Sequence, residues 1–323
     1  MAQNNTSTIE RRAKARRITS VANGIGGAFL VGFGAIRVIN FILGMTLPEE
    51  LIINEGFIWI LQIVLSVLMF VPCFIIFTKP MNTRVSAAID FSLPKKGTGL
   101  PMIFFAVGMS LAANVLGGMF TDVLEFIGLR DTETVLSSDP TTGVLLPIIS
   151  VLASAALPAL IEEFAIHGIV LGAMRPFGDR FAIVISSLMF GLMHGTVEQI
   201  PFAFVGSLAA CFAIIRSGSI WVGVAAHFIN NFIACIIDIA TAGVSEEVGA
   251  VVGSLLFVLA LFLSLFGLYL SRERDLFSLP DEKMPELSSG LKFGAYLRAP
   301  CIIIMIIWII LEMVENTIFA GMM

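Results

Sequence analysis

The chain has 323 residues, of which 57% are hydrophobic and 13% are charged, and its formal net charge is −5. A charged fraction about half that of ordinary soluble domains, with a mean hydropathy of +0.96, excludes a soluble globular protein. The apolar residues fall into repeated runs long enough to cross a bilayer, which predicts an all-α, polytopic membrane helix bundle. The small and evenly spread net charge gives no surface for nucleic acid, so partners are expected in or at the membrane.

The apolar runs predict about nine transmembrane helices in a membrane domain over 20–323, preceded by a basic cytoplasmic tail over 1–19. The predicted spans are 20–45, 56–78, 100–121, 144–174, 181–196, 199–216, 219–240, 248–271 and 299–321. The first run is too long for a signal peptide and lacks a clear cleavage site, so we expect a retained helix. The segments 80–99 and 272–298 mix apolar and basic residues, which predicts cytoplasmic interfacial segments.

Basic residues gather on one side of the predicted bundle. Of the 19 lysines and arginines, 17 fall in the N-terminal tail or in connections on the same side. The opposite connections, 46–55, 122–143 and 241–247, are acidic and hold one basic residue, Arg130. Because basic loops stay in the cytoplasm, this pattern places the N-terminus in the cytoplasm and the C-terminus outside.

The cysteines show no pattern typical of a disulfide framework or a zinc knuckle. All four lie in apolar runs without close pairing: Cys73, Cys211, Cys235 and Cys301. We therefore interpret them as small buried hydrophobic residues.

Ionisable side chains inside the apolar runs are concentrated in one part of the chain. Glu162 and Glu163 lie in the fourth run, and the only histidines are His167, His194 and His227. A charge at mid-membrane costs at least about 2.5 kcal/mol on insertion scales, so each group is a functional candidate. At about 1.5 Å per residue, Glu162, His194 and His227 lie about 18, 20 and 12 Å from the cytoplasmic ends of their helices. We therefore expect one shared, water-filled pocket.

Helical spacing separates the two glutamates. Glu163 and His167 are four residues apart and share one helix face, whereas Glu162 is rotated by about 100°. Glu163 is therefore expected to be paired, and Glu162 to be available as a general base or acid. His227 and Asn231, also four residues apart, can donate hydrogen bonds to a developing oxyanion.

These residues form three motifs that resemble those of the CAAX protease and bacteriocin-processing (CPBP) family of intramembrane proteases. The family motifs are Glu-Glu-x-x-x-Arg, Phe-x-x-x-His and His-x-x-x-Asn. Their counterparts here are Glu162-Glu163-x-x-x-His167, Phe190-x-x-x-His194 and His227-x-x-x-Asn231. The stretch from Arg216 to Trp221 also resembles the family's entry to the third motif. One departure is His167 at the arginine position, which makes the support of Glu163 weaker and dependent on pH.

The resemblance implies a peptide-bond hydrolase with a catalytic core over 144–240. In this assignment Glu162 and His194 activate water, while His227 and Asn231 stabilise the oxyanion. The supporting residues would be Glu163, His167 and Phe190. The expected substrate is a membrane-embedded or lipidated peptide or protein, and the expected location is the plasma membrane of a bacterium. No cofactor is favoured, because Asn231 is a poor zinc ligand, although zinc held by Glu162, His194 and His227 stays open.

Two other interpretations stay open. The polar residues can form a structural cluster that stabilises helix packing, with the histidines satisfied in the core. A non-hydrolytic membrane protein of the same fold, serving bacteriocin immunity, scaffolding or transport, would use the same pocket without cleaving a peptide. The replacement of the family arginine by His167 is its main support. The sequence has no His-Glu-x-x-His motif and no convincing internal repeat, which disfavours a zincin and, mildly, a transporter.

Overall fold

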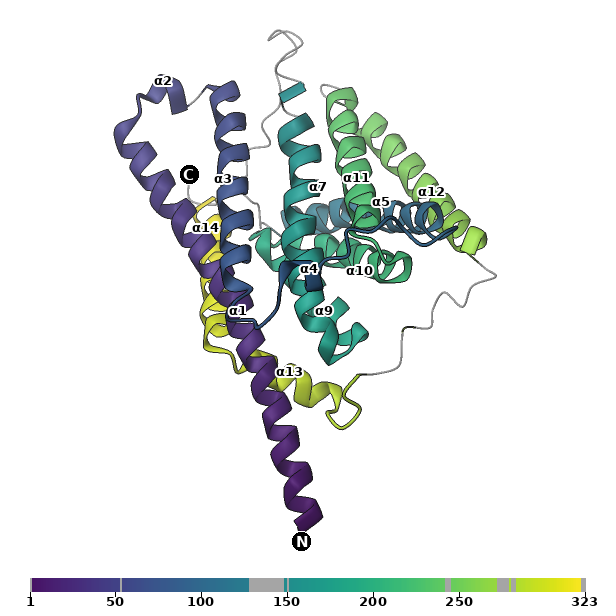
Figure 1. The fold of residues 1–323 in the computed structure, drawn as a ribbon. Helices are drawn as coiled ribbons and strands as arrows, with labels where there is room; N and C mark the ends of the chain where they lie inside the picture. Colours follow the sequence, from purple (N-terminus) through teal and green to yellow (C-terminus); the bar gives the residue numbers. More distant parts are fainter. Residues whose placement is uncertain are drawn as a thin grey trace.

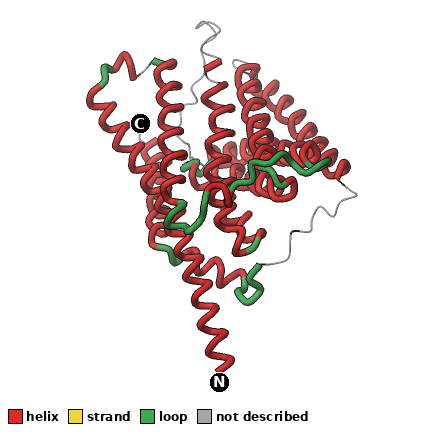
Figure 2. Tube along the Cα trace, in the orientation of Figure 1, coloured by secondary structure: helices red, strands yellow, loops and turns green. Residues whose placement is uncertain are grey.

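The computed structural model describes residues 2–52, 54–127, 148–149, 151–241, 245–271, 279 and 283–320. Within these residues every regular element is a helix (Figures 1 and 2), which confirms the all-α class. The long helices are α1 (Ala2–Thr46), α3 (Glu55–Phe77), α5 (Gly99–Phe126), α9 (Asp179–Met193), α10 (Gln199–Ser217), α11 (Ile220–Thr241), α12 (Glu246–Ser271) and α14 (Pro300–Ala320). Three shorter helices are α2 (Glu49–Ile52), α4 (Val85–Ala88) and α13 (Ser289–Leu297).

The predicted fourth span is a run of helical turns of different kinds between Leu152 and Phe177. Its α-helical parts are α7 (Leu157–Glu162) and α8 (Leu171–Met174). They alternate with two π-helical stretches, η2 (Leu152–Ala156) and η3 (Glu163–Val170), before the 3-10 turn η4 (Arg175–Phe177). Such π-turns are rare and are often found at functional sites.

The membrane-spanning character of the bundle agrees with the prediction, but the number of spans does not follow directly. Seven helices of the described chain are long and apolar enough to cross a membrane, and α13 with α14, bent by 75°, makes an eighth. The predicted span 181–196 corresponds to α9, which has 15 residues, fewer than the roughly 20 that a bilayer requires. The count of nine and the orientation therefore stay predictions.

The predicted tail 1–19 continues directly into the first span, because α1 is one helix of 45 residues. Its N-terminal part lies at the same end of the bundle as α13 (Figure 1). Thr19 Oγ1 donates to the carbonyl of Ala295 at 2.7 Å, and Lys14 forms an ion pair with Glu286. This part of α1 therefore docks on α13. Arg130, residues 144–147 and most of 272–282 lie outside the described residues.

The helix α7, which carries Glu162, packs against both α3 and α11 (Figure 1). A second group consists of α5 with α10 and α12. Gly108 and Gly267 let α5 and α12 approach closely, because a Cβ at Gly108 would lie 2.6 Å from the Ala260 carbonyl oxygen. A Cβ at Gly267 would lie 2.6 Å from the Phe105 nitrogen. Small residues at such contacts are typical of helices packed in membranes.

The predicted interfacial segment 80–99 forms hydrogen bonds with the residues between α10 and α11 and with the start of α11. The carbonyl of Asp90 accepts from the Ile220 N–H at 3.0 Å, and that of Ser92 accepts from Ser219 Oγ at 2.6 Å. Trp221 Nε1 donates to the Phe91 carbonyl at 2.9 Å. The first N–H groups of a helix lack intrahelical partners. The segment thus supplies an acceptor at the start of α11, the helix that carries the third motif.

Candidate active site

The structure brings all seven residues singled out in the sequence to one cavity of about 430 Å³. They come from three successive parts of the chain: α7 with η3, α9 and its end, and α11. The seven are Glu162, Glu163, His167, Phe190, His194, His227 and Asn231. Further polar lining comes from Gln62 on α3, Asn114 on α5, and Gln199 and Ser207 on α10. Six helical parts of the chain therefore contribute polar groups to one space inside the bundle.

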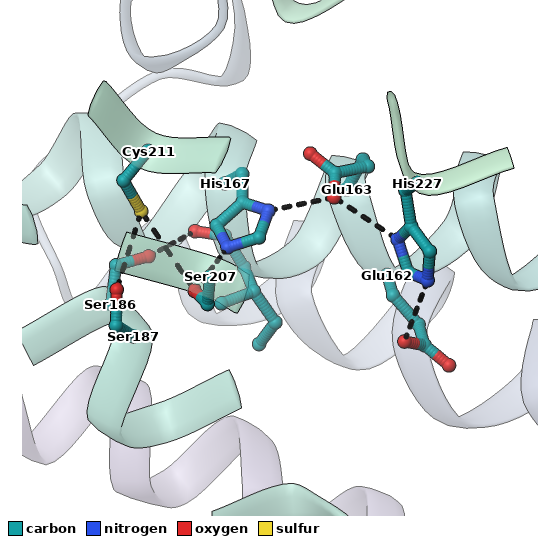
Figure 3. Close-up of polar contacts among 9 residues, drawn as sticks. Glu162, Glu163, His167, Ser186, Ser187, Ser207, Cys211 and His227 are labelled. Carbon is teal, nitrogen blue, oxygen red and sulfur yellow. Dashed lines mark hydrogen bonds and ion pairs between the residues drawn. The ribbon is translucent and has the colours of Figure 1, made fainter. Parts of the chain in front are cut away.

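Glu163 lies between two histidines, as Figure 3 shows. Its Oε1 is 2.8 Å from His167 Nδ1 and accepts a hydrogen bond from His227 Nδ1 at 3.1 Å. The carboxylate is 1% exposed, and its Oε2 has no hydrogen-bond partner in the described chain. A carboxylate this deeply buried depends on such partners for its stability. Glu163 is therefore a fixed anchor for two imidazoles.

His167 occupies the position of the family arginine and keeps the contact with Glu163. Its second ring nitrogen, Nε2, is 2.6 Å from Ser207 Oγ on α10. Ser207 Oγ is in turn 4.0 Å from Cys211 Sγ, which also accepts from Ser187 Oγ at 3.7 Å (Figure 3). Both nitrogens of the buried ring thus have polar neighbours. Through its contacts with Glu163 and Ser207, the histidine links η3 to α10.

Phe190 contacts the rings of all three histidines. Its ring centroid lies 5.1 Å from that of His167 in a stacked arrangement, and 5.0 and 5.7 Å from those of His194 and His227 in edge-on arrangements. These separations and angles are the ones that aromatic pairs prefer. The apolar residue of the second motif therefore fixes how the imidazoles are spaced.

The hydrogen bond of His194 determines which of its nitrogens is free. Nδ1 lies 2.8 Å from the carbonyl oxygen of Phe190. Because a carbonyl only accepts, Nδ1 carries the proton, and the neutral ring presents the lone pair of Nε2. The helix ends directly after this residue, since Gly195 has a φ of +73°, in the left-handed region that favours glycine. His194 thus projects from the end of α9 with one nitrogen able to accept a proton.

His227 lies between the two glutamates, and Glu162 is the more open of the two. His227 Nε2 is 4.0 Å from Glu162 Oε2, while its Nδ1 is bound to Glu163. The side chain of Glu162 is 18% exposed, against 1% for Glu163. No hydrogen bond or ion pair joins Glu162 to His194 within the described residues, so the predicted pair would act through a water between them. The geometry leaves Glu162 as the carboxylate with room for a reactant.

Asn231 is held by two hydrogen bonds. Its Nδ2 donates to the carbonyl of Ser154 at 3.2 Å, and its Oδ1 accepts from Asn230 Nδ2 at 3.1 Å. Neither contact was predicted from the sequence, and neither was the role of Ser207. Asn230 is adjacent to a motif residue, but no spacing rule identifies Ser154 or Ser207 as a partner.

The donor groups do not fit a metal site in this arrangement. Among the described residues, no three histidine, cysteine, aspartate or glutamate side chains are grouped so that they can hold an ion. The set left open by the sequence, Glu162, His194 and His227, does not form such a group.

Comparison with known proteins shows which family this core is similar to. Residues 144–233 match the family described as "Type II CAAX prenyl endopeptidase Rce1-like". The match contains all three motifs and confirms the resemblance to CPBP intramembrane proteases.

A curated relative supports the same assignment. Over 177 residues this chain is 24% identical to YdiL of Bacillus subtilis (strain 168), a protein named provisionally as a membrane peptidase. The alignment covers 54% of this chain and 71% of YdiL. No solved structure matches the chain.

A glycine on α11 makes room for the buried carboxylate. A Cβ at Gly223 would overlap Glu163 Oε2 and would lie 2.5 Å from Ile214 Cδ1. Because two histidines hold Glu163, we expect Gly223→Ala to lower the free energy of unfolding by about 1–3 kcal/mol. Unfolding in detergent tests this. Gly249→Ala on α12, where a Cβ meets nothing within 4 Å, is the matched control, and equal losses for the two variants would contradict the account.

Proposed function

We propose that the protein is an intramembrane endopeptidase that hydrolyses a peptide bond with a water activated by glutamate and histidine. One observation carries the proposal: Glu162, His194, His227 and Asn231, from three separate helical segments, line one cavity among apolar helices. The Rce1-like match of the core helices and the name of YdiL support a peptidase.

The proposed first step is the attack of water on the peptide carbonyl. A water between Glu162 and His194 gives a proton to the carboxylate or to Nε2 of the imidazole, and its oxygen forms a bond to the carbonyl carbon. The same proton is then returned to the leaving nitrogen as the C–N bond breaks. General bases placed within hydrogen-bond reach of the reacting water supply this kind of assistance.

The tetrahedral intermediate carries a negative oxygen, and we assign its stabilisation to His227 and Asn231. Since His227 Nδ1 donates to Glu163, the ring offers a second donor, Nε2–H, only when it is an imidazolium. Both carboxylates face the ring, since Nδ1 is bound to Glu163 and Nε2 lies 4.0 Å from Glu162 Oε2. The buried carboxylate of Glu163 therefore accepts from Nδ1 and leaves Nε2 directed away from it. Asn231 contributes an N–H of its amide.

The proposed substrate is a membrane-embedded or lipidated peptide or protein, because the cavity lies among helices that are long and apolar enough to span a bilayer. The proposed location is the plasma membrane of a bacterium.

The proposal is tested with the purified protein in detergent, mixed with synthetic membrane-segment peptides and prenylated peptides, with mass spectrometry as the readout. We expect new peptide termini that form equally well with and without a chelator. Absence of cleavage in both peptide classes and in a digest of whole membrane proteins would contradict the proposal and favour a non-hydrolytic role. Cleavage abolished by the chelator would contradict the metal-free chemistry.

Removal of the oxyanion donor is expected to affect kcat more than KM. Asn231→Ala and Asn231→Asp should both lower kcat by about 10²- to 10³-fold, because each removes an N–H that is needed only when charge develops. Steady-state kinetics on a cleaved peptide measures both constants. Full activity in Asn231→Asp, which keeps the shape but has no N–H, would exclude this role.

A further inference from the structure

Three asparagines form a chain of hydrogen bonds that runs from α5 to the site. Asn114 Nδ2 donates to Asn230 Oδ1 at 3.0 Å, and Asn230 Nδ2 donates to Asn231 Oδ1 at 3.1 Å. Asn231 Nδ2 then donates to the carbonyl of Ser154 at 3.2 Å. This chain of hydrogen bonds joins α5, α11 and η2. Its first member lies outside residues 144–233, the segment that matches the Rce1-like family.

The carbonyl of Ser154 lies in the π-helical stretch η2, four residues before Pro158, which has no N–H to donate to it. Asn231 donates to this carbonyl at the end of the hydrogen-bond chain. Because a carbonyl can only accept, the NH₂ group of Asn231 must face it.

This fixed end sets the orientation of every amide in the chain. With its NH₂ group toward Ser154, Asn231 presents Oδ1 to Asn230, which must donate to it. Asn230 in turn presents Oδ1 to Asn114, which must also donate. Asn231 carries two N–H bonds, and one of them is used by Ser154. The other is a donor on a residue that lines the cavity.

We propose that Asn114 is a positioning residue of this site, which holds the Asn231 amide, through Asn230, in the orientation that offers an N–H to the oxyanion. The inference rests on the proposed function and extends it to a helix that no motif includes. If the chain loosens, the Asn231 amide can rotate and turn its oxygen toward the oxyanion, where it is repulsive. Asn114 does not itself touch the reacting atoms.

The decisive variant is Asn114→Asp, in which a carboxylate accepts but does not donate. Asn230 must then donate to position 114, so that the orientation imposed from α5 conflicts with the one imposed by Ser154. We expect kcat to fall by about 10-fold, with KM unchanged within about twofold. Asn114→Ala removes the donor without reversing it and should have a smaller effect.

A pH series separates positioning from packing. When the introduced carboxyl is protonated it can donate to Asn230 again, so the ratio of variant to wild-type kcat should rise as the pH is lowered. The other ionisable groups of the described cavity lining are Glu162, Glu163, His167, His194 and His227. These are present in all the variants, so Asn114→Ala, measured over the same pH range, shows the change that does not come from the introduced carboxyl. A purely structural role predicts equal effects of Asp and Ala and no recovery at low pH.

The matched control is Asn23→Asp on α1. Asn23 Oδ1 accepts from the Cys301 N–H at 3.1 Å, a role that aspartate keeps, and Asn23 does not belong to the described cavity lining. We expect wild-type kcat for this variant, and unfolding temperatures in detergent within a few degrees for all three variants. If the wild type cleaves and Asn114→Asp is fully active, or matches Asn114→Ala at every pH, the positioning role is wrong while the proposed function stands. A wild type that cleaves nothing overturns both.

Discussion

Glu162→Gln should lower kcat for peptide cleavage by about 10²- to 10⁴-fold, the range that a positioned general base contributes. Glutamine has almost the same shape but does not take a proton from water. Glu162 is the more exposed of the two glutamates, and its Oε2 lies 4.0 Å from His227 Nε2. The fold does not depend on a close ion pair at this residue, so the variant should remain folded. Cleavage kinetics and unfolding in detergent measure the two effects separately.

The matched control for this change is Glu315→Gln on α14. This glutamate lies on another membrane helix and lines a different surface cleft, together with Arg37 and Trp308. The chemical change is identical, so any general effect of removing a carboxylate from the bundle appears in both variants. Comparable activities of Glu162→Gln and Glu315→Gln would show that Glu162 does not activate water.

Glu163→Gln should instead act mainly on stability, lowering the free energy of unfolding by about 3 kcal/mol. Its carboxylate is enclosed and lies within 3.1 Å of nitrogens of both His167 and His227. Glutamine places an NH₂ group in this enclosed space, so the buried contacts of the two imidazoles are disturbed, which costs far more than losing an exposed pair. Unfolding by heat or denaturant in a fixed detergent measures the loss.

A double variant separates charge balance from shape. Glu163→Gln combined with His167→Gln removes both members of the buried pair, and we expect it to be more stable than Glu163→Gln alone. The coupling follows from their contact at 2.8 Å. If Glu163→Gln unfolds at the wild-type temperature, or if the two changes are simply additive, the carboxylate is not the anchor of the site.

The sequence predicts those parts of the site that depend on spacing within one helix. Glu163 and His167, four residues apart, are in contact, and the motif residues of the three helices reach one cavity. Glu162 is indeed the more open glutamate. These features follow from helix geometry and from the need to enclose ionisable groups in a membrane protein, both of which can be read from a single chain.

Other features depend on contacts between distant segments, which no local pattern encodes. Asn114 lies in an apolar run, and its partner Asn230 is 116 residues away. The partner of His167, Ser207, comes from a different helix. The π-helical turns of η2 and η3 change the register around Glu163 without any signal in the apolar periodicity. Pro158, which has no N–H, is a sequence feature that interrupts regular helical hydrogen bonds in this stretch.

The contacts of the predicted interfacial segment 80–99 and of the tail 1–19 also depend on distant parts of the chain. Composition indicates that residues 1–19 are basic and that residues 80–99 mix apolar and basic side chains, but not what they contact. In the structure, the carbonyls of Asp90 and Ser92 accept from the start of α11, and Thr19 donates to α13. Unsatisfied backbone groups at helix ends explain the first contact. Which segment satisfies them is decided by the whole fold.

In the proposed mechanism, this cavity hydrolyses a peptide bond with a water that Glu162 activates. The most direct test is cleavage of a membrane-segment peptide in water enriched in heavy oxygen, comparing the wild type with Glu162→Gln by mass spectrometry. The account predicts that the wild type yields a product whose new carboxyl group carries one heavy oxygen, and that Glu162→Gln yields almost none. Equal amounts of labelled product from both proteins would contradict it.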